Sequence, residues 1–274
     1  MQYYTTWDTS EKIGIIHNVH IKNNSIEKLK LSGILVNVAI INGFTIENNE
    51  IKDASLSRSS DDKFIFKGCI NFNRINEDLR YDWSNIVIRN NTLLTNFSAE
   101  KSTMTSDYGW SIIFISTSNG SSTPTNSIIK GVDVVGNIMR DTMQGVRFSV
   151  LSSIGNIDGI TISHNILSTS GKSIEIEKYI SGLSIASNTF DNCNSLGLAD
   201  TRCIVAWGGS ITNMFINGNV GYSKNMLSLL SSRSNINKTL VCNNAMRLKN
   251  ATTVEFLETS MTKDCIQQYN TIIN

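Results

Sequence analysis

The chain has 274 residues and a mass of 30.3 kDa, which is enough to bury a core without disulfide bonds or metal ions. Its 24 basic and 23 acidic residues leave a net charge of +1, so it has no field that would attract nucleic acid or an anionic membrane. Ile occurs 37 times, Asn 33 times, Leu 18 times and Pro once. Because Ile favours strands and Asn favours tight turns, this composition excludes helical bundles and coiled coils.

No run of 18 apolar residues is present, so we expect no insertion into a membrane. Residues 1–12 lack the basic start and apolar middle of a signal peptide, which predicts a leaderless protein or a fragment of a longer chain. The five cysteines are odd in number, widely separated and without a C-x-x-C pair, so we expect buried thiols and neither disulfide bonds nor a zinc site. They are Cys69, Cys193, Cys203, Cys242 and Cys265.

A short unit recurs along the chain. It begins with a small residue and an apolar–x–apolar triplet, and an asparagine follows after two further residues. The triplet predicts a short strand with two side chains pointing inward, and the asparagine predicts a corner. The copies occupy residues 18–26, 43–51, 85–93, 131–139, 159–167, 182–190 and 213–221, with a weaker copy at 238–246 and half a copy at 268–273.

The asparagine of each copy serves as its anchor, and successive anchors are separated by 25, 42, 46, 28, 23, 31, 25 and 26 residues. If the corners stack, each amide can bond the same amide one coil away, which predicts an asparagine ladder. The anchors are Asn24, Asn49, Asn91, Asn137, Asn165, Asn188, Asn219, Asn244 and Asn270.

Between the anchors lies a second kind of run with alternating apolar residues. Each repeat therefore carries about three strands, which make one coil of a parallel solenoid. The two longest gaps hold one such run each, so we interpret them as single coils with long loops at about 52–63, 71–84, 94–110 and 117–130. The runs are at 37–41, 64–68, 111–116, 145–150, 173–178, 203–207 and 226–230.

Two other folds have features in common with this repeat. A leucine-rich repeat has a similar unit and period, but it requires Leu at the ladder positions and a helical return segment, whereas here Ile predominates and the return segments are strand-like. An antiparallel β-sandwich would require hairpin turns and no fixed anchor. The pattern therefore favours an all-β fold, a right-handed parallel β-helix of about nine coils with long loops.

The repeat, with its asparagine turn after the second strand, resembles that of the right-handed parallel β-helix proteins, over about residues 13–246. This family includes pectate lyases, polygalacturonases and, closest in style, bacteriophage tailspikes that bind and cut bacterial surface polysaccharide. No catalytic signature of a particular member is visible. We expect a single domain over residues 1–274, with 1–12 as an N-terminal cap or fragment edge and 247–274 as a terminal coil or cap.

The resemblance implies that a glycan lies along the sheet formed by the second runs. Strand alternation in 145–150 points Val146 and its apolar partners inward and leaves Arg147 and Ser149 facing solvent. In 173–178 the same argument places Ser173, Glu175 and Glu177 outward. Counted from their anchors, Arg147 and Glu175 share one offset, as do Ser149 and Glu177. The next rung should present Arg202, Val205 and Trp207.

Glycoside hydrolysis requires a carboxylic acid and a second carboxylate that acts as base or nucleophile. Residues at i and i+2 on a strand are about 6.6 Å apart, which suits Glu175 and Glu177. Their proximity should raise one pKa, and Arg147 could keep the other carboxylate ionised or bind a uronic or sialic acid. The alternative, that these side chains are solvated charges that prevent aggregation, stays open.

Three aromatic and acidic stretches, at 80–85, 105–110 and 204–209, are candidates for sugar binding. Here we expect Asp107, Tyr108, Trp110 and Trp207 to contact the glycan, because aromatic rings stack on sugar faces. Equally, such residues could cap their own loops or contact a neighbouring subunit. Further aspartates near the loops that enter these strands could replace a glutamate in catalysis, Asp200 above all; the others are Asp107, Asp141 and Asp191.

The remaining motifs argue against other chemistries. We expect His164 to be a corner residue, and neither a G-x-S-x-G motif nor a phosphate-binding loop is present. Calcium binding has no diagnostic ligand spacing, so we expect no metal site and no cofactor.

The resemblance predicts a homotrimer on a virion tail, outside the cell, whose partner is a bacterial capsular or lipopolysaccharide glycan, and which does not bind nucleic acid. The alternatives are a non-catalytic adhesive rod and a uronic-acid lyase with Arg147 or a nearby lysine as base.

Overall fold

The structure is a computed structural model of the chain. Its described residues are 15–28, 32–38, 40–54, 68–74, 82–95, 110–116, 128–142, 144–150, 156–169, 171–177, 180–193, 202–222, 228–232, 235–247, 257–259 and 262–273.

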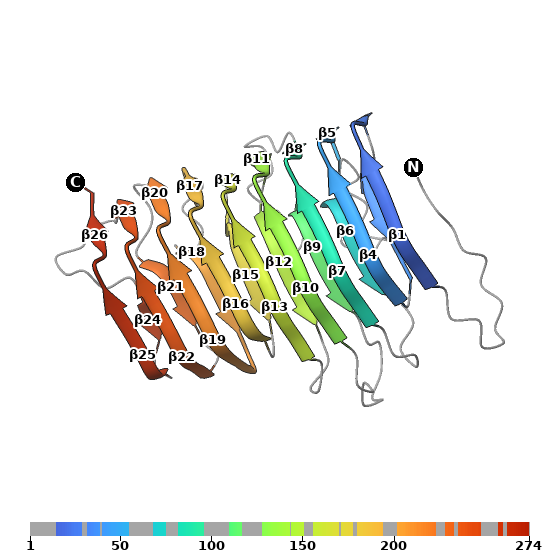
Figure 1. Ribbon diagram of the computed structural model, residues 1–274. Helices are drawn as coiled ribbons and strands as arrows, with labels where there is room; N and C mark the ends of the chain where they lie inside the picture. The colour runs from blue at the N-terminus through green and yellow to red at the C-terminus, as the bar shows by residue number, and fades with distance from the viewer. Residues whose placement is uncertain are drawn as a thin grey trace.

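Three parallel sheets run side by side along the molecule (Figure 1). The first sheet contains the long strands β1 (Ile15–Lys22), β4 (Ile40–Glu47), β7 (Asp82–Arg89), β10 (Ile128–Val135), β13 (Asn156–Ser163), β16 (Ile180–Ala186), β19 (Ser210–Asn217), β22 (Asn235–Cys242) and β25 (Thr262–Gln268). The second sheet contains the short strands β2 (Ser25–Glu27), β5 (Glu50–Lys52), β8 (Thr92–Leu94), β11 (Ile138–Thr142), β14 (Ile166–Thr169), β17 (Thr189–Asp191), β20 (Val220–Tyr222), β23 (Ala245–Arg247) and β26 (Thr271–Ile272). The third sheet contains β3 (Ile34–Val36), β6 (Gly68–Arg74), β9 (Trp110–Ser116), β12 (Gln144–Val150), β15 (Ile174–Glu177), β18 (Arg202–Trp207), β21 (Ser228–Ser232) and β24 (Leu257–Thr259).

The chain visits the three sheets in a fixed order, and every third strand is a hydrogen-bonded neighbour in the same sheet. One long strand, one short strand and one strand of the third sheet make a coil, and the coils stack along the rod seen in Figure 1. The fold is a right-handed parallel β-helix, as the sequence predicted. The return segments are strands, and no helix occurs in the described ranges, which excludes the leucine-rich repeat.

The predicted asparagine ladder is present and unbroken from Asn24 to Asn270. In each step the backbone N–H and the side-chain Nδ2 of one anchor donate to Oδ1 of the next, at 2.9 and 3.0 Å from Asn137 to Asn165. The same Nδ2 group also donates to a strand carbonyl of the preceding coil, for example from Asn165 to Val134 O at 2.9 Å. The ladder passes directly through Asn49, Asn91 and Asn137, so the two longest repeats are single coils, as predicted.

Left-handed backbone conformations explain the small residues of the repeat. A positive φ occurs six residues before every anchor, where the repeat favours Gly or Asn, because a side chain with a branched Cβ is strained there. These residues are Asn18, Gly43, Asn85, Gly131, Gly159, Gly182, Asn213, Lys238 and Asp264. A second positive φ occurs directly before every anchor and makes the corner, and His164 is one of these residues, as predicted.

Alternating apolar residues from all three sheets fill the interior of the coils. In the third sheet one aromatic ring per coil stacks on the next: the centroids of Phe72 and Phe114 are 4.7 Å apart, and those of Phe114 and Phe148 are 4.6 Å apart. Phe72, Phe114 and Phe148 point into the coil. The residues directly before and after each of them on β6, β9 and β12 therefore point away from the core.

One predicted strand of the third sheet is misplaced, and the bounds of one predicted loop differ. The run at 37–41 was expected to enter this sheet, but the strand there is Ile34–Val36, and Ile40 already begins β4. Residues 34–41 are almost continuously apolar, so periodicity alone does not locate the corner. Of the run expected at 64–68, residues 64–67 lie outside the described residues; β6 extends from Gly68 to Arg74, so part of the expected loop at 71–84 is strand.

Candidate functional site

The outer face of the third sheet carries two neighbouring rows of residues whose register the sequence predicted. One row contains Arg147, Glu175 and Val205 in direct register. The adjacent row contains Ser149, Glu177 and Trp207. Their inward neighbours, Val146, Phe148, Ile174 and Ile176, are all buried in the core, so the predicted alternation is confirmed.

The predicted exposure of this face is wrong at its centre. Arg147 is 7% exposed and Glu175 is 4% exposed, whereas the Glu177 side chain keeps 18% of its surface and Trp207 is half-buried. Lys172 is also buried. The four charged side chains Arg147, Lys172, Glu175 and Glu177 form what we call the charged cluster. It reaches solvent at Glu177.

Each carboxylate of the charged cluster is paired with a cation. Arg147 Nη2 donates to Glu177 Oε1 at 2.7 Å and lies 4.0 Å from Glu175 Oε1. Lys172 Nζ donates to Glu175 Oε2 at 2.8 Å. The pairs are largely removed from water, so their attraction is screened much less than that of surface ion pairs.

Two tryptophans flank the charged cluster. The Arg147 guanidinium carbon lies 5.3 Å from the ring centre of Trp110, and Lys172 Nζ lies 4.9 Å from that of Trp207, both within the range of cation–π attraction. Trp110 is fully buried, so the expectation that it forms a sugar platform at the edge of a groove does not fit this structure. The half-buried ring of Trp207 remains available for that role.

Burial is the main reason why the pKa of the Glu175 carboxyl is raised above its ordinary value. The charges of Lys172 and Arg147 and the hydrogen bond from Lys172 oppose this effect, and a side-chain hydrogen bond with Glu177 reinforces it. A carboxyl with a raised pKa retains its proton closer to neutral pH, which is the property that a general acid requires.

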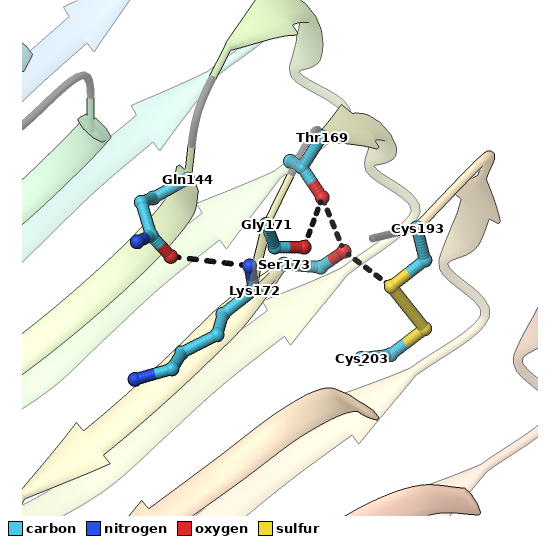
Figure 2. The surroundings of a disulfide bond; sticks show 7 residues. All are labelled: Gln144, Thr169, Gly171, Lys172, Ser173, Cys193 and Cys203. Carbon is cyan, nitrogen blue, oxygen red and sulfur yellow. Dashed lines mark hydrogen bonds between the residues drawn. A yellow bond between two sulfur atoms is a disulfide. The ribbon is translucent and has the colours of Figure 1, made fainter. Parts of the chain in front are cut away.

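Lys172 is the principal site residue that sequence reasoning missed. It lies before β15 begins, where strand alternation does not yet apply, and it contacts Glu175 from three residues away. Its backbone N–H donates to Gln144 Oε1 at 3.1 Å, which ties this corner to the start of β12 (Figure 2). The only sequence feature that pointed to Lys172 was its position next to a strand with two glutamates. That feature does not distinguish a buried ion pair from a solvated one.

A disulfide bond between Cys193 and Cys203 lies directly behind this corner (Figure 2), which corrects the expectation of thiols only. Cys193 follows β17 and Cys203 lies in β18, and the coil brings their Cα atoms to 5.9 Å, within the range of disulfides. The spacing of cysteines along the chain does not predict this disulfide, because the two residues come together only where the chain passes from the second sheet to the third. Ser173, expected on the outer face, instead contacts Cys193 Sγ at 3.1 Å.

The other predicted site residues are not brought into the charged cluster by the described part of the structure. Arg202 begins β18 and is in register with Ser228, and its side chain is not among the described ones. Asp141 and Asp191 lie exposed in the second sheet. Asp107, Tyr108 and Asp200 lie outside the described residues.

No three His, Cys, Asp or Glu side chains in the described residues lie together as the ligands of a metal ion would. Nor does the described part of the chain contain a helix that could cross a membrane.

The fold defines the chain as a parallel β-helix protein. No family model, curated protein or solved structure matches the chain. The assignment to the β-helix class therefore rests on the three parallel sheets and the asparagine ladder.

Proposed function

We propose that the chain binds a bacterial surface polysaccharide, capsule or O-antigen, and cleaves it by glycoside hydrolysis at Glu175 and Glu177. The observation that carries the proposal is the pair of adjacent glutamates on the outer face of a β-helix sheet, one buried and one reaching solvent. Two carboxyl groups in different environments are the chemical requirement of this reaction.

The different environments suggest the division of roles. Glu175, whose pKa is raised by burial, donates a proton to the glycosidic oxygen. Glu177 is hydrogen-bonded by Arg147 and partly exposed, so it is suited to act on water or on the sugar as a carboxylate. Trp207, half-buried and in register with Glu177, offers a ring face for the sugar.

The separation of the two carboxyl groups decides which step must precede catalysis. Retaining glycosidases hold these groups about 5–5.5 Å apart and inverting ones about 6.5–9.5 Å apart. Here Arg147 Nη2 lies 2.7 Å from Glu177 Oε1 and 4.0 Å from Glu175 Oε1, so the guanidinium joins the two carboxyl groups and must move before a glycosidic oxygen can lie between them. We favour hydrolysis over a uronic-acid lyase, because both cations of the charged cluster are bound to carboxylates and are poor bases in that state.

The test is release of reducing ends from purified capsular and lipopolysaccharide glycans by the whole chain. We expect Glu175→Gln and Glu177→Gln each to lower the rate at least a hundredfold while glycan binding is kept. Glu50, which pairs with Lys52 at 2.8 Å on the second sheet, supplies a matched control as Glu50→Gln. Cleavage that persists in both cluster variants removes Glu175 and Glu177 from the mechanism.

A second candidate is a glycan-binding rod that cleaves nothing. It is favoured by the mutual pairing of all four charged side chains, which is also what a purely structural cluster would show. Binding of a glycan without any release of reducing ends, in the wild-type chain, would identify this function.

The proposal also includes the oligomeric state of the protein. From the resemblance to tailspikes we propose a homotrimer attached to a virion tail. Light scattering coupled to size-exclusion chromatography measures the number of chains directly, and a monomer at micromolar concentration would contradict this part.

A further inference from the structure

An apolar row lies on the outer face of the first sheet, at the C-terminal end of the rod formed by β19, β22 and β25 (Figure 1). Phe215, Leu240 and Ile266 are in direct register on these three neighbouring strands. The residues on either side of Phe215, Met214 and Ile216, are buried in the core, so the row points outward. Phe215 is 36% exposed and Ile266 is 56% exposed, and Leu240 is half-buried between them. We call these three residues the apolar row.

The position that the apolar row occupies is mostly polar in the coils nearer the N-terminus. Followed back through the register from Phe215, the residues at this position are Ser184, Thr161, Asp133, Val87 and Thr45. The strand pattern therefore does not require large apolar side chains here. Of the five exposed large hydrophobic side chains among the described residues, four lie in the last three coils: Phe215, Tyr222, Ile266 and Tyr269.

The charge of this face also changes along the rod. In the adjacent outward row at the N-terminal end, Glu47 is paired with Lys22 at 3.0 Å and with Arg89 at 2.9 Å. In the last three coils the same row contains no acidic or basic residue; its members there are Asn217, Cys242 and Gln268. The core of a protein–protein interface is depleted of charged residues and enriched in aromatic ones, so this end of the face has the composition of such a core.

Two opposite charges lie at the edge of the apolar row. Lys238 and Asp264 each precede their anchor by six residues, on neighbouring strands, and both are exposed. Neither forms an ion pair with another described residue. A second copy of the chain carries the same two charges, so Lys238 of one copy is complementary to Asp264 of the next.

We propose that the apolar row is the centre of a contact surface between copies of this chain. In a cyclic assembly with parallel rods, each residue lies at the same height as its own copies, so a row confined to the last three coils meets identical rows at the axis. The inference rests on the proposed homotrimer and names the face of the rod that joins its chains. The charged cluster lies on the third sheet, which is a different face, and is therefore not part of this contact.

Light scattering coupled to size-exclusion chromatography tests the surface on the whole chain at micromolar concentration. We expect the wild-type mass to be three times that of one chain, 30.3 kDa, and both Phe215→Lys and Ile266→Lys to lower it threefold. The reason is that each substitution places like charges together at the axis. The matched control is Thr161→Lys, which adds the same charge at the same position of the repeat, two strands before Phe215, and should leave the mass unchanged.

Cross-linking keeps the proposal testable if a lysine variant does not fold. Ile266→Cys changes one exposed side chain on an edge strand. We expect a short bismaleimide reagent to join two chains of Ile266→Cys at least tenfold faster than it joins two wild-type chains or two chains of Thr161→Cys. Absence of a covalent dimer from Ile266→Cys, or a trimer that persists in both lysine variants, would overturn the surface.

The surface and the proposed hydrolysis can fail separately. Release of reducing ends by a wild-type chain that is a monomer removes the surface and leaves the hydrolysis. A trimer that Phe215→Lys dissociates, in a chain that cleaves no polysaccharide, removes the hydrolysis and leaves the surface.

Discussion

Replacing a central anchor of the asparagine ladder is expected to destabilise the protein far more than replacing an exposed asparagine. Asn165 is buried, and its backbone N–H and side chain take part in five hydrogen bonds. Its N–H and Nδ2 donate to Asn188 Oδ1, both at 3.0 Å, and Nδ2 also donates to Val134 O. Its own Oδ1 accepts from the N–H and the Nδ2 of Asn137.

Asn165→Ala leaves the backbone N–H of Asn137 without its acceptor, whereas Asn188 Oδ1 keeps the bond from the backbone N–H of residue 165. The substitution also removes the two bonds from Asn165 Nδ2, to Asn188 Oδ1 and to Val134 O. Asn137 Nδ2 keeps its bond to Ile88 O at 2.9 Å, so its loss is not counted. At about 1–3 kcal/mol for the unsatisfied N–H and about 1 kcal/mol for each of the two lost bonds, we expect a loss of about 3–5 kcal/mol in the free energy of unfolding. Asn165→Asp keeps the acceptor, but it buries a carboxylate whose second oxygen faces Val134 O and Asn188 Oδ1, so we expect its cost to be at least as large.

Urea denaturation followed by circular dichroism measures the loss, and hydrogen exchange at the Asn137 amide reports the local opening of the coil. The control is Asn42→Ala. Asn42 is exposed and accepts a single hydrogen bond from Asn85 at 2.9 Å, so we expect a change within about 0.5 kcal/mol. If Asn165→Ala costs no more than Asn42→Ala, the ladder does not hold the coils in register and the argument is wrong.

Three further predictions concern the third sheet. Titration of the unfolded, unreduced chain with a thiol reagent should find three thiols, because Cys193 and Cys203 are joined; five would contradict the disulfide. The raised pKa of Glu175 means that the folded state binds its proton more tightly, so its contribution to stability is complete below the ordinary value of 4.5 and is lost as the pH rises. The melting temperature of the wild type relative to Glu175→Gln should therefore fall between pH 4 and pH 8, and a flat difference would refute the shift. Gly145→Ala should cost about 3 kcal/mol or more in urea denaturation, since its Cβ would overlap the carbonyl oxygen of Ser173; a neutral effect would show that β12 and β15 are not so closely spaced.

The architecture could be predicted from sequence because one interaction repeats in every coil. Asn91 and Asn137 bond each other across 46 residues as closely as Asn165 and Asn188 do across 23. Coils can therefore be recognised in the sequence from their anchor asparagines, whatever the length of the loops between the anchors. The start of β3 was not predictable in this way, because residues 34–41 carry apolar side chains through a corner and no anchor marks it.

The register of the site was predictable, and its environment was not. Offsets from the anchors placed Arg147 beside Glu175, and Glu177 beside Trp207, correctly. Alternation within a strand predicts on which face a side chain lies. It does not predict whether that face is covered, and the burial of Arg147 depends on this. Lys172 was missed for a related reason, since corners between strands have no periodicity from which to read the direction of a side chain.

The distribution of polar groups gives the main reason to assign function to the third sheet. In the second sheet and its corners, buried polar side chains such as Asn137 and Asn188 are bonded within the ladder. On the outer face of the third sheet, three buried charged side chains, Arg147, Lys172 and Glu175, lie beside the partly exposed Glu177. A buried ion pair stabilises a fold no better than well-packed apolar residues do. If this face served only to join coils, apolar side chains would do so at lower cost, and the concentration of charged groups between β12 and β18 is the pattern that a binding or catalytic surface requires.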